Sequence, residues 1–166
     1  MPRTRSQGII FSLIMSYAMA YGMEVYNVAI RMGFMALPGG LSNMTNAVFL
    51  EALKEASFMG IIVFIVSGWY GTRIGECIFE GLASPQDSPI IRQLLRQACT
   101  VGIMCPSMSL IASILFNILL GGMPWHQLIA IWAGTLLKNF PMAFFWNAYA
   151  ASPLTRRIFS RLFPQN

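Results

Sequence analysis

Charged and amide side chains interrupt the apolar stretches of this chain at positions where they could bind an ion or relay protons. The most prominent are Lys138 and Asn139, in the middle of the apolar run Leu128–Tyr149. A helix of about 20 residues crosses the roughly 30 Å of bilayer hydrocarbon, so Lys138 is predicted near mid-depth. A charge there is costly unless an opposite charge, a carbonyl or enclosed water lies beside it.

Two acids in other apolar stretches could neutralise this lysine. Glu24 lies three residues before Asn27, so both share one face of a predicted helix, and Glu55 follows Lys54 near the start of another. We expect six residues to face inward as one buried polar cluster: Lys138, Glu24, Asn139, Glu55, Asn27 and Lys54.

The cluster has a functional and a structural interpretation. A desolvated lysine loses its proton readily and a desolvated carboxylate gains one, so the cluster could relay protons. A fixed ion pair that sets helix register is the alternative. Lys54 and Glu55 are also close enough to the predicted interface to reach water, and Glu24 could pair locally with Arg31, seven residues on.

Two prolines are candidates for helix breaks. Pro106 and Pro141 lack an N–H group, which leaves the carbonyls of Gly102 and Leu137 without their helical donors. Broken helices near mid-membrane bind ions in many transporters, although prolines are also tolerated in ordinary membrane helices.

Evidence for a metal, a cofactor or catalysis is weak. Met104, Cys105 and Met108 offer soft ligands on one predicted helix, but methionine is a common packing residue and the single histidine, His126, adds no ligand. We therefore expect no metal and no cofactor. The sequence has no nucleophile–base set, P-loop or dinucleotide-binding glycine motif, so we expect no enzyme and no catalytic residue.

The composition is typical of an integral membrane protein. Hydrophobic residues make up 56% and charged residues 10% of the 166-residue chain, whereas soluble domains carry about 25% charged residues. The net charge of +5 comes from arginines near predicted helix ends, which argues against nucleic-acid binding. We expect one membrane domain over residues 1–166 and three free cysteine thiols.

The predicted fold is an all-α membrane bundle. Ser88 and Pro89 are typical of a helix start and open a short amphipathic juxtamembrane helix, whereas residues 73–86 are expected to form a polar, turn-rich connection. Four transmembrane helices are expected, at about residues 9–30, 49–71, 98–120 and 128–149.

The distribution of basic residues predicts the orientation. Eight arginines are expected on one side of the membrane: Arg3, Arg5, Arg73, Arg92, Arg96, Arg156, Arg157 and Arg161. The other side has Arg31 and the interfacial Lys54. The excess places both termini in the cytoplasm.

The two halves of the chain resemble each other. Ile14–Ser16 with Met19 matches Ile103–Cys105 with Met108, and residues 69–79 match residues 149–159. Both halves start on the same side, which predicts a parallel repeat of helical hairpins, about residues 8–80 and 88–160.

Several motifs near the predicted helices form a recognisable set: Ile14–Met19 with Tyr26–Asn27, Phe49–Glu55, Leu137–Ala143, Pro153–Leu154 and Arg157–Phe159. In these motifs the chain resembles small bacterial inner-membrane proteins grouped as domain of unknown function 2798, which are built from a two-helix unit. The resemblance implies a multi-pass protein of the bacterial inner membrane and carries no activity with it.

We therefore expect a small membrane transporter or channel for an ion or small solute. The alternative is a non-catalytic scaffold or accessory subunit whose buried charges are structural. The expected partners are the lipid bilayer, an ion or small solute, and further copies of the chain, because four helices enclose little space alone.

Overall fold

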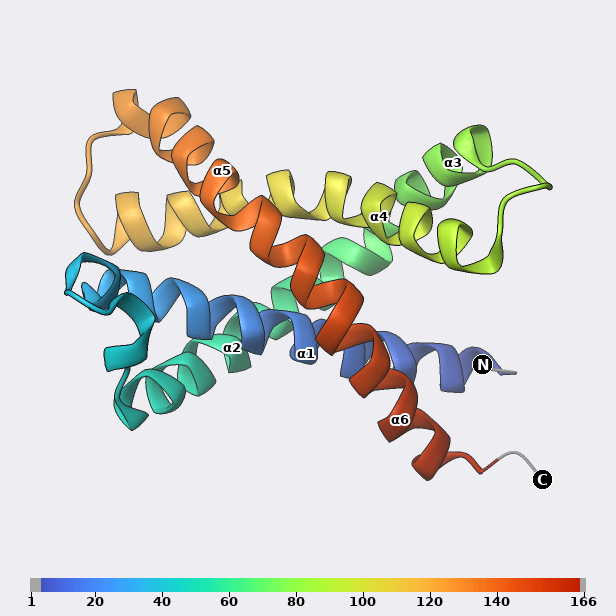
Figure 1. Cartoon of the computed structure of the whole chain (residues 1–166). Coiled ribbons are helices and arrows are strands. Elements are labelled where there is room, and N and C mark those ends of the chain that lie inside the picture. The colour runs from blue at the N-terminus through green and yellow to red at the C-terminus, as the bar shows by residue number, and fades with distance from the viewer. Residues whose placement is uncertain (1–3, 165–166) are drawn as a thin grey trace. The chain divides into compact units, whose positions relative to one another are not determined.

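The computed structural model describes residues 4–164, which form helices and no strand (Figure 1). Arg3, counted above for orientation, lies outside this range. The α-helices are α1 (Arg5–Arg31), α2 (Asn46–Val66), α3 (Thr72–Leu82), α4 (Pro89–Ala112), α5 (Leu128–Trp146) and α6 (Ser152–Leu162). The π-helical segments η3 (Ser67–Gly71), η4 (Ser113–Leu119) and η6 (Asn147–Ala151) extend α2, α4 and α5 without a break, so α2 continues into α3 and α5 into α6.

Three helical runs are long and apolar enough to cross a membrane, which is consistent with a membrane protein. They are Arg5–Arg31, Pro89–Leu119 and Trp125–Leu162. The span expected at residues 49–71 is not confirmed. This region belongs mostly to α2, which carries Glu51, Lys54 and Glu55 within its first ten residues.

The sequence-based prediction for residues 73–86 is wrong over most of its length, because α3 covers Thr72–Leu82. The physical reason is its packing: Phe79 is 3% exposed, and the guanidinium of Arg96 on α4 lies 4.6 Å from the Phe79 ring centroid. A short helix with two interior glycines is marginal in isolation and depends on such contacts.

The amphipathic piece expected ahead of the third span is the first part of one continuous helix, α4. Its start is as predicted: the Ser88 hydroxyl accepts a hydrogen bond from the Ile91 N–H at 3.3 Å, and Pro89 occupies the first turn. No proline or glycine follows until Gly102, so nothing separates this piece from the apolar part.

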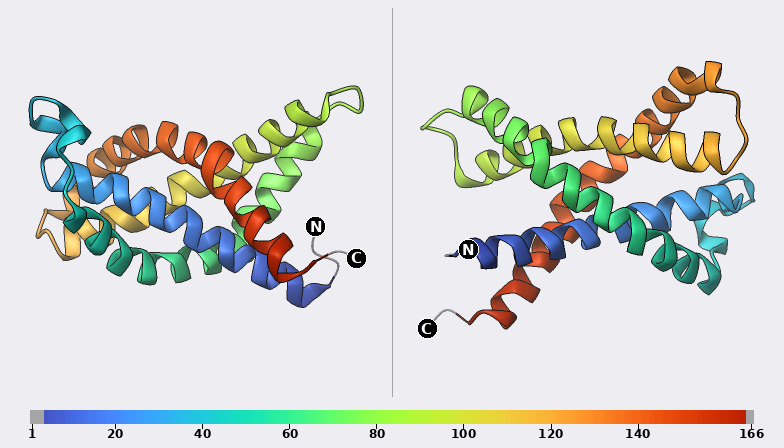
Figure 2. Two further views of the ribbon diagram at one scale, coloured as in Figure 1. Left: turned by 60° about the horizontal axis from the view of Figure 1, so that its bottom comes forward. Right: turned by 180° about the vertical axis from the view of Figure 1, so that it is seen from behind.

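The chain folds into two compact units. The first contains α1, α2 and α6, and the second contains α3, α4 and α5. In each unit, two long helices form a hairpin, and an 11-residue helix packs on the N-terminal part of the first (Figure 2). This short helix is α6 at the end of the chain in the first unit and α3, directly before α4, in the second.

The first unit is held by small residues between α1 and α2 and by aromatic contacts with α6. Its buried core contains Val28, Ala29, Val48 and Ala52. Further along, Gly60 faces the ring of Tyr17 so closely that a Cβ at residue 60 would lie 2.7 Å from Tyr17 Cδ1. The α6 contacts include an edge-on pair of Phe11 and Phe159, with ring centroids 5.4 Å apart.

The second unit also depends on a close helix contact at a glycine. A Cβ at Gly75 of α3 would lie 2.9 Å from the Cα of Thr100 on α4. Beside it, Gly71 makes room for Met104, whose sulfur would lie 2.1 Å from an added Cβ. Small residues thus set how closely α3 approaches α4.

Candidate polar sites in the two units

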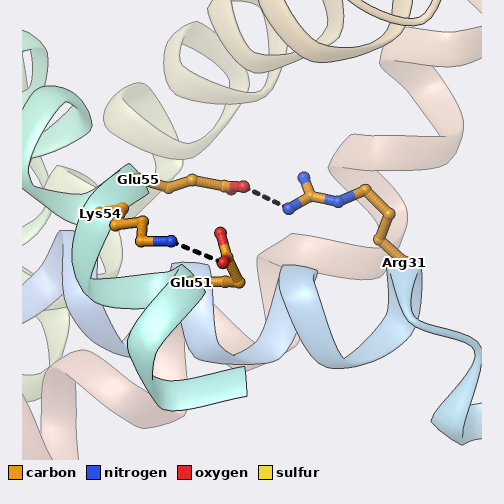
Figure 3. Close-up of polar contacts among 4 residues, drawn as sticks. All are labelled: Arg31, Glu51, Lys54 and Glu55. Carbon is orange, nitrogen blue, oxygen red and sulfur yellow. Dashed lines mark hydrogen bonds and ion pairs between the residues drawn. The ribbon is translucent and has the colours of Figure 1, made fainter. Parts of the chain in front are cut away.

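Two ion pairs lie at the hairpin end of the first unit (Figure 3). Arg31 Nη2 pairs with Glu55 Oε1, and Lys54 Nζ lies 2.8 Å from Glu51 Oε1. The Arg31 side chain is 49% exposed and that of Glu55 is 18% exposed. The second oxygen of Glu55, Oε2, is buried and accepts no hydrogen bond from residues 4–164.

The apolar core of the first unit positions the Arg31–Glu55 pair. Arg31 comes three residues after Val28 on α1, and Glu55 comes three residues after Ala52 on α2. Val28 and Ala52 pack in the same core, and this packing holds the segments of α1 and α2 that carry Arg31 and Glu55 next to each other.

Glu24 lies deeper in the same unit and is 5% exposed. It is one turn before Val28, and its neighbour Asn27 is half-buried. The first unit therefore carries three acids on its hairpin, namely Glu24 on α1 and Glu51 and Glu55 on α2, together with the basic residues Arg31 and Lys54.

In the second unit, neutral polar groups link the two helices of the hairpin, α4 with its extension η4 and α5. The Ser113 hydroxyl donates to Thr135 Oγ1 at 3.3 Å, which turns the Thr135 side of α5 toward α4. Asn139 and Ala143 follow at four-residue intervals, so they lie on the same side of α5. Asn139 is 5% exposed, and its Oδ1 finds no donor within the described part of the chain. Lys138, the next residue along, is half-buried.

The two candidate helix breaks lie within continuous helices. Pro106 is inside α4 and Pro141 inside α5, and both helices continue through them. The irregular turns begin later, at Ser113 and Asn147. A membrane helix tolerates the loss of one N–H donor when side chains or neighbouring turns satisfy the backbone.

Sequence reasoning missed one contact at Pro106. The indole N–H of Trp132 donates to the Pro106 carbonyl at 2.9 Å, linking α5 to α4. Trp132 in an apolar run could have indicated such a contact, since a buried indole N–H usually donates to an acceptor.

The sulfur residues have packing roles in this structure. Met104 fills the space beside Gly71, and the Cys105 thiol lies 3.9 Å from the Ser109 hydroxyl. Between residues 4 and 164, no group of three or more His, Cys, Asp or Glu side chains is placed to hold a metal. All three cysteines are free, as predicted, with Cys99 and Cys105 buried.

The six predicted cluster residues divide between the units. Glu24, Asn27, Lys54 and Glu55 lie in the first, and Lys138 and Asn139 lie in the second. The structure pairs Glu55 with Arg31 and Lys54 with Glu51, whereas a contact between Lys138 and an acid stays a prediction. The Lys54–Glu51 pair could have been predicted, because residues three apart on a helix are neighbours.

One comparison with known proteins gives a match. The family model described as "Domain of unknown function (DUF2798)" matches residues 89–163, which contain α4, α5 and α6. No curated protein and no solved structure matches the chain. The match agrees with the resemblance seen in the motifs of the second half. Residues 89–163 are thus a segment of this uncharacterised family.

Proposed function

We propose that this protein is a small membrane transporter or channel for an ion or small solute. The observation that carries the proposal is the burial of Glu24 and Asn139, each 5% exposed, on helical runs apolar enough to cross a membrane. Polar groups are costly at such positions and typically mark an ion or solute pathway. The Asn139 Oδ1 finds no donor among residues 4–164, so it offers an acceptor to water or a solute.

In this proposal Lys138 is the central charged group and Glu24 or Glu55 is its acidic partner. Asn27, Asn139 and Lys54 supply further polar contacts. Glu55 uses one oxygen for Arg31, and its buried Oε2 remains as an acceptor for another donor.

A flux assay on the full chain in liposomes tests the proposal. Lys138→Met keeps the length of the side chain and removes its charge, so flux of the transported ion or solute should fall at least about tenfold. Leu137→Met is the matched control, because Leu137 is the adjacent residue and is 77% exposed. Flux that persists in the Lys138→Met variant would refute the assigned role of Lys138.

The second candidate function is a scaffold or accessory subunit of a membrane complex. The Arg31–Glu55 pair favours it, because it links α1 to α2 within one unit and can fix the hairpin without changing state. The Lys54–Glu51 pair lies within α2 and can likewise be structural. A folded wild-type chain that carries no common ion or solute would support this function. In that case Lys138→Met should instead weaken the assembly, as measured by size-exclusion chromatography with light scattering.

We also propose four spans, a homo-oligomer and a place in the bacterial inner membrane with both termini cytoplasmic. The three apolar helical runs support a membrane location in general. Cysteine variants at exposed positions near each predicted span end, labelled from either side of the membrane, would test the four-span topology and its orientation.

The internal repeat is a further proposal, and the exposure pattern of α3 and α6 supports it. Four pairs of apolar residues 80 apart in number have similar exposure. Phe79 and Phe159 are 3% and 4% exposed and pack against the hairpins. The exposed apolar residues also correspond: Ile74 with Leu154, Ile78 with Ile158, and Leu82 with Leu162.

A further inference from the structure

The C-terminal helix α6 has three distinct faces. Ser152, Thr155 and Phe159 are buried in the first unit, where Phe159 packs on Phe11. Beside this buried face lies a stripe of exposed apolar residues at four-residue intervals: Leu154 at 47%, Ile158 at 37% and Leu162 at 57% exposure. The remaining face carries three exposed arginines, namely Arg156, Arg157 and Arg161.

The charge of α6 has one sign. Between Ser152 and Leu162 there are three arginines and no acidic residue. The corresponding helix α3 has the same exposed apolar stripe but carries Glu76 and Glu80 with a single arginine, Arg73. The apolar stripe is therefore shared by the two helices, and the basic face distinguishes α6.

The helical run that ends in α6 has more residues than one membrane span needs. The run Trp125–Leu162 has 38 residues, whereas about 20 residues cross the hydrocarbon of a bilayer. When its apolar part crosses a membrane, its basic end extends to the headgroup region or beyond.

We propose that α6 is a docking helix for anionic phospholipid headgroups. Its exposed stripe of Leu154, Ile158 and Leu162 enters the edge of the hydrocarbon, and the arginines bind lipid phosphates. This division of apolar and basic faces is typical of helices that lie in a membrane interface. Guanidinium groups pair well with phosphate, and each basic residue near an anionic leaflet adds to the attraction.

Lipid titration of the purified full chain in neutral detergent tests the proposal. Native mass spectrometry would compare phosphatidylglycerol with phosphatidylcholine of the same acyl chains. Arg157→Gln with Arg161→Gln should weaken phosphatidylglycerol binding about tenfold and leave phosphatidylcholine binding unchanged.

The matched control is Arg73→Gln with Arg92→Gln, which removes two exposed arginines from the second unit. An equal loss of phosphatidylglycerol binding in this variant would overturn the proposal, because the effect would then follow net charge alone. Competition by inorganic phosphate at the same concentration as the lipid would also overturn it, since a lipid surface would not be required.

A second variant separates the apolar stripe from the charges. Ile158→Gln keeps all three arginines, and we expect it to weaken binding of both lipids by a few-fold. Unchanged lipid binding in this variant would refute insertion of the stripe. Circular dichroism and thermal unfolding of each variant would establish that the helices are intact before lipid is added.

Discussion

The two long helices of each unit are linked by a different kind of polar contact. The first pairs Arg31 with Glu55, and the second joins Ser113 to Thr135 through hydroxyl groups. Under the proposed repeat, Glu55 corresponds to Thr135, 80 residues on, and Glu24 corresponds to Ser113, 89 residues on. If the proposed repeat holds, carboxylates in one unit take the places of hydroxyls in the other.

This comparison separates the packing that stabilises each unit internally from the polar contacts that differ between the units. Both units contain an 11-residue helix that buries one phenylalanine against the first long helix, Phe79 in one and Phe159 in the other. The ring of Phe79 lies under Arg96, whereas that of Phe159 meets Phe11. Aromatic and small-residue packing is therefore common to the units, whereas their ion pairs differ in place: Arg31–Glu55 links the hairpin helices of the first unit, and Arg96–Glu76 links α3 to α4 in the second.

The largest predicted effect is on the shared packing. Gly75→Ala places a methyl group 2.9 Å from the backbone of Thr100, which cannot move aside as a side chain can. We expect a loss of about 1–3 kcal/mol in the free energy of unfolding, seen as a lower midpoint in a detergent denaturation series.

Gly81→Ala is the control on the same helix, because no atom lies within 4 Å of its added Cβ. It should leave stability unchanged or raise it by up to about 1 kcal/mol, the gain in helix propensity. An equal loss in both variants would mean that glycine flexibility in α3, and not close packing on α4, is required.

The second prediction concerns the ion pair of the first unit. Arg31→Met leaves Glu55 partly buried without this partner, and we expect a loss of about 1–2 kcal/mol in unfolding free energy. The estimate is moderate because Arg31 is half-exposed to solvent. A double-mutant cycle with Glu55→Gln measures the coupling, and additive effects would show that the pair does not stabilise the hairpin.

The smallest effect is expected for the hydroxyl pair of the second unit. Ser113→Ala should lower the free energy of unfolding by about 0.6 kcal/mol, the typical value for a side-chain hydrogen bond between membrane helices. Thr135→Val should cause a similar loss, and the double variant should lose less than the sum of the two single losses. A loss as large as that of Arg31→Met would remove the energetic difference between the two hairpins.

Much of the fold could be predicted from apolar periodicity and helix-start signals. The apolar runs of α1, α4 and α5 and the Ser88–Pro89 start were predicted and are present. Helix α3 was missed because Gly75 and Gly81 and its charges weaken the local helical signal. Its stability comes from α4, and a contact partner cannot be identified from a segment's own composition.

The polar positions could be identified only in part. Glu24 and Asn139 stand out in sequence as polar residues in apolar runs, and both are buried. The pairing of Arg31 with Glu55 could not be foreseen, because the two residues are 24 apart and meet only when the intervening loop folds back. Positive-φ glycines in that loop, Gly33 and Gly39, help the chain reverse.

The sequence by itself determined the helical class, the apolar runs and the places where polar groups interrupt them. These properties follow from side-chain hydrophobicity and local backbone preference, which act over a few residues. Only the tertiary structure decided that α6 packs with α1 and that α3 packs with α4. Each short helix buries its phenylalanine where a neighbouring helix leaves space, and that complementarity exists only once both helices have formed.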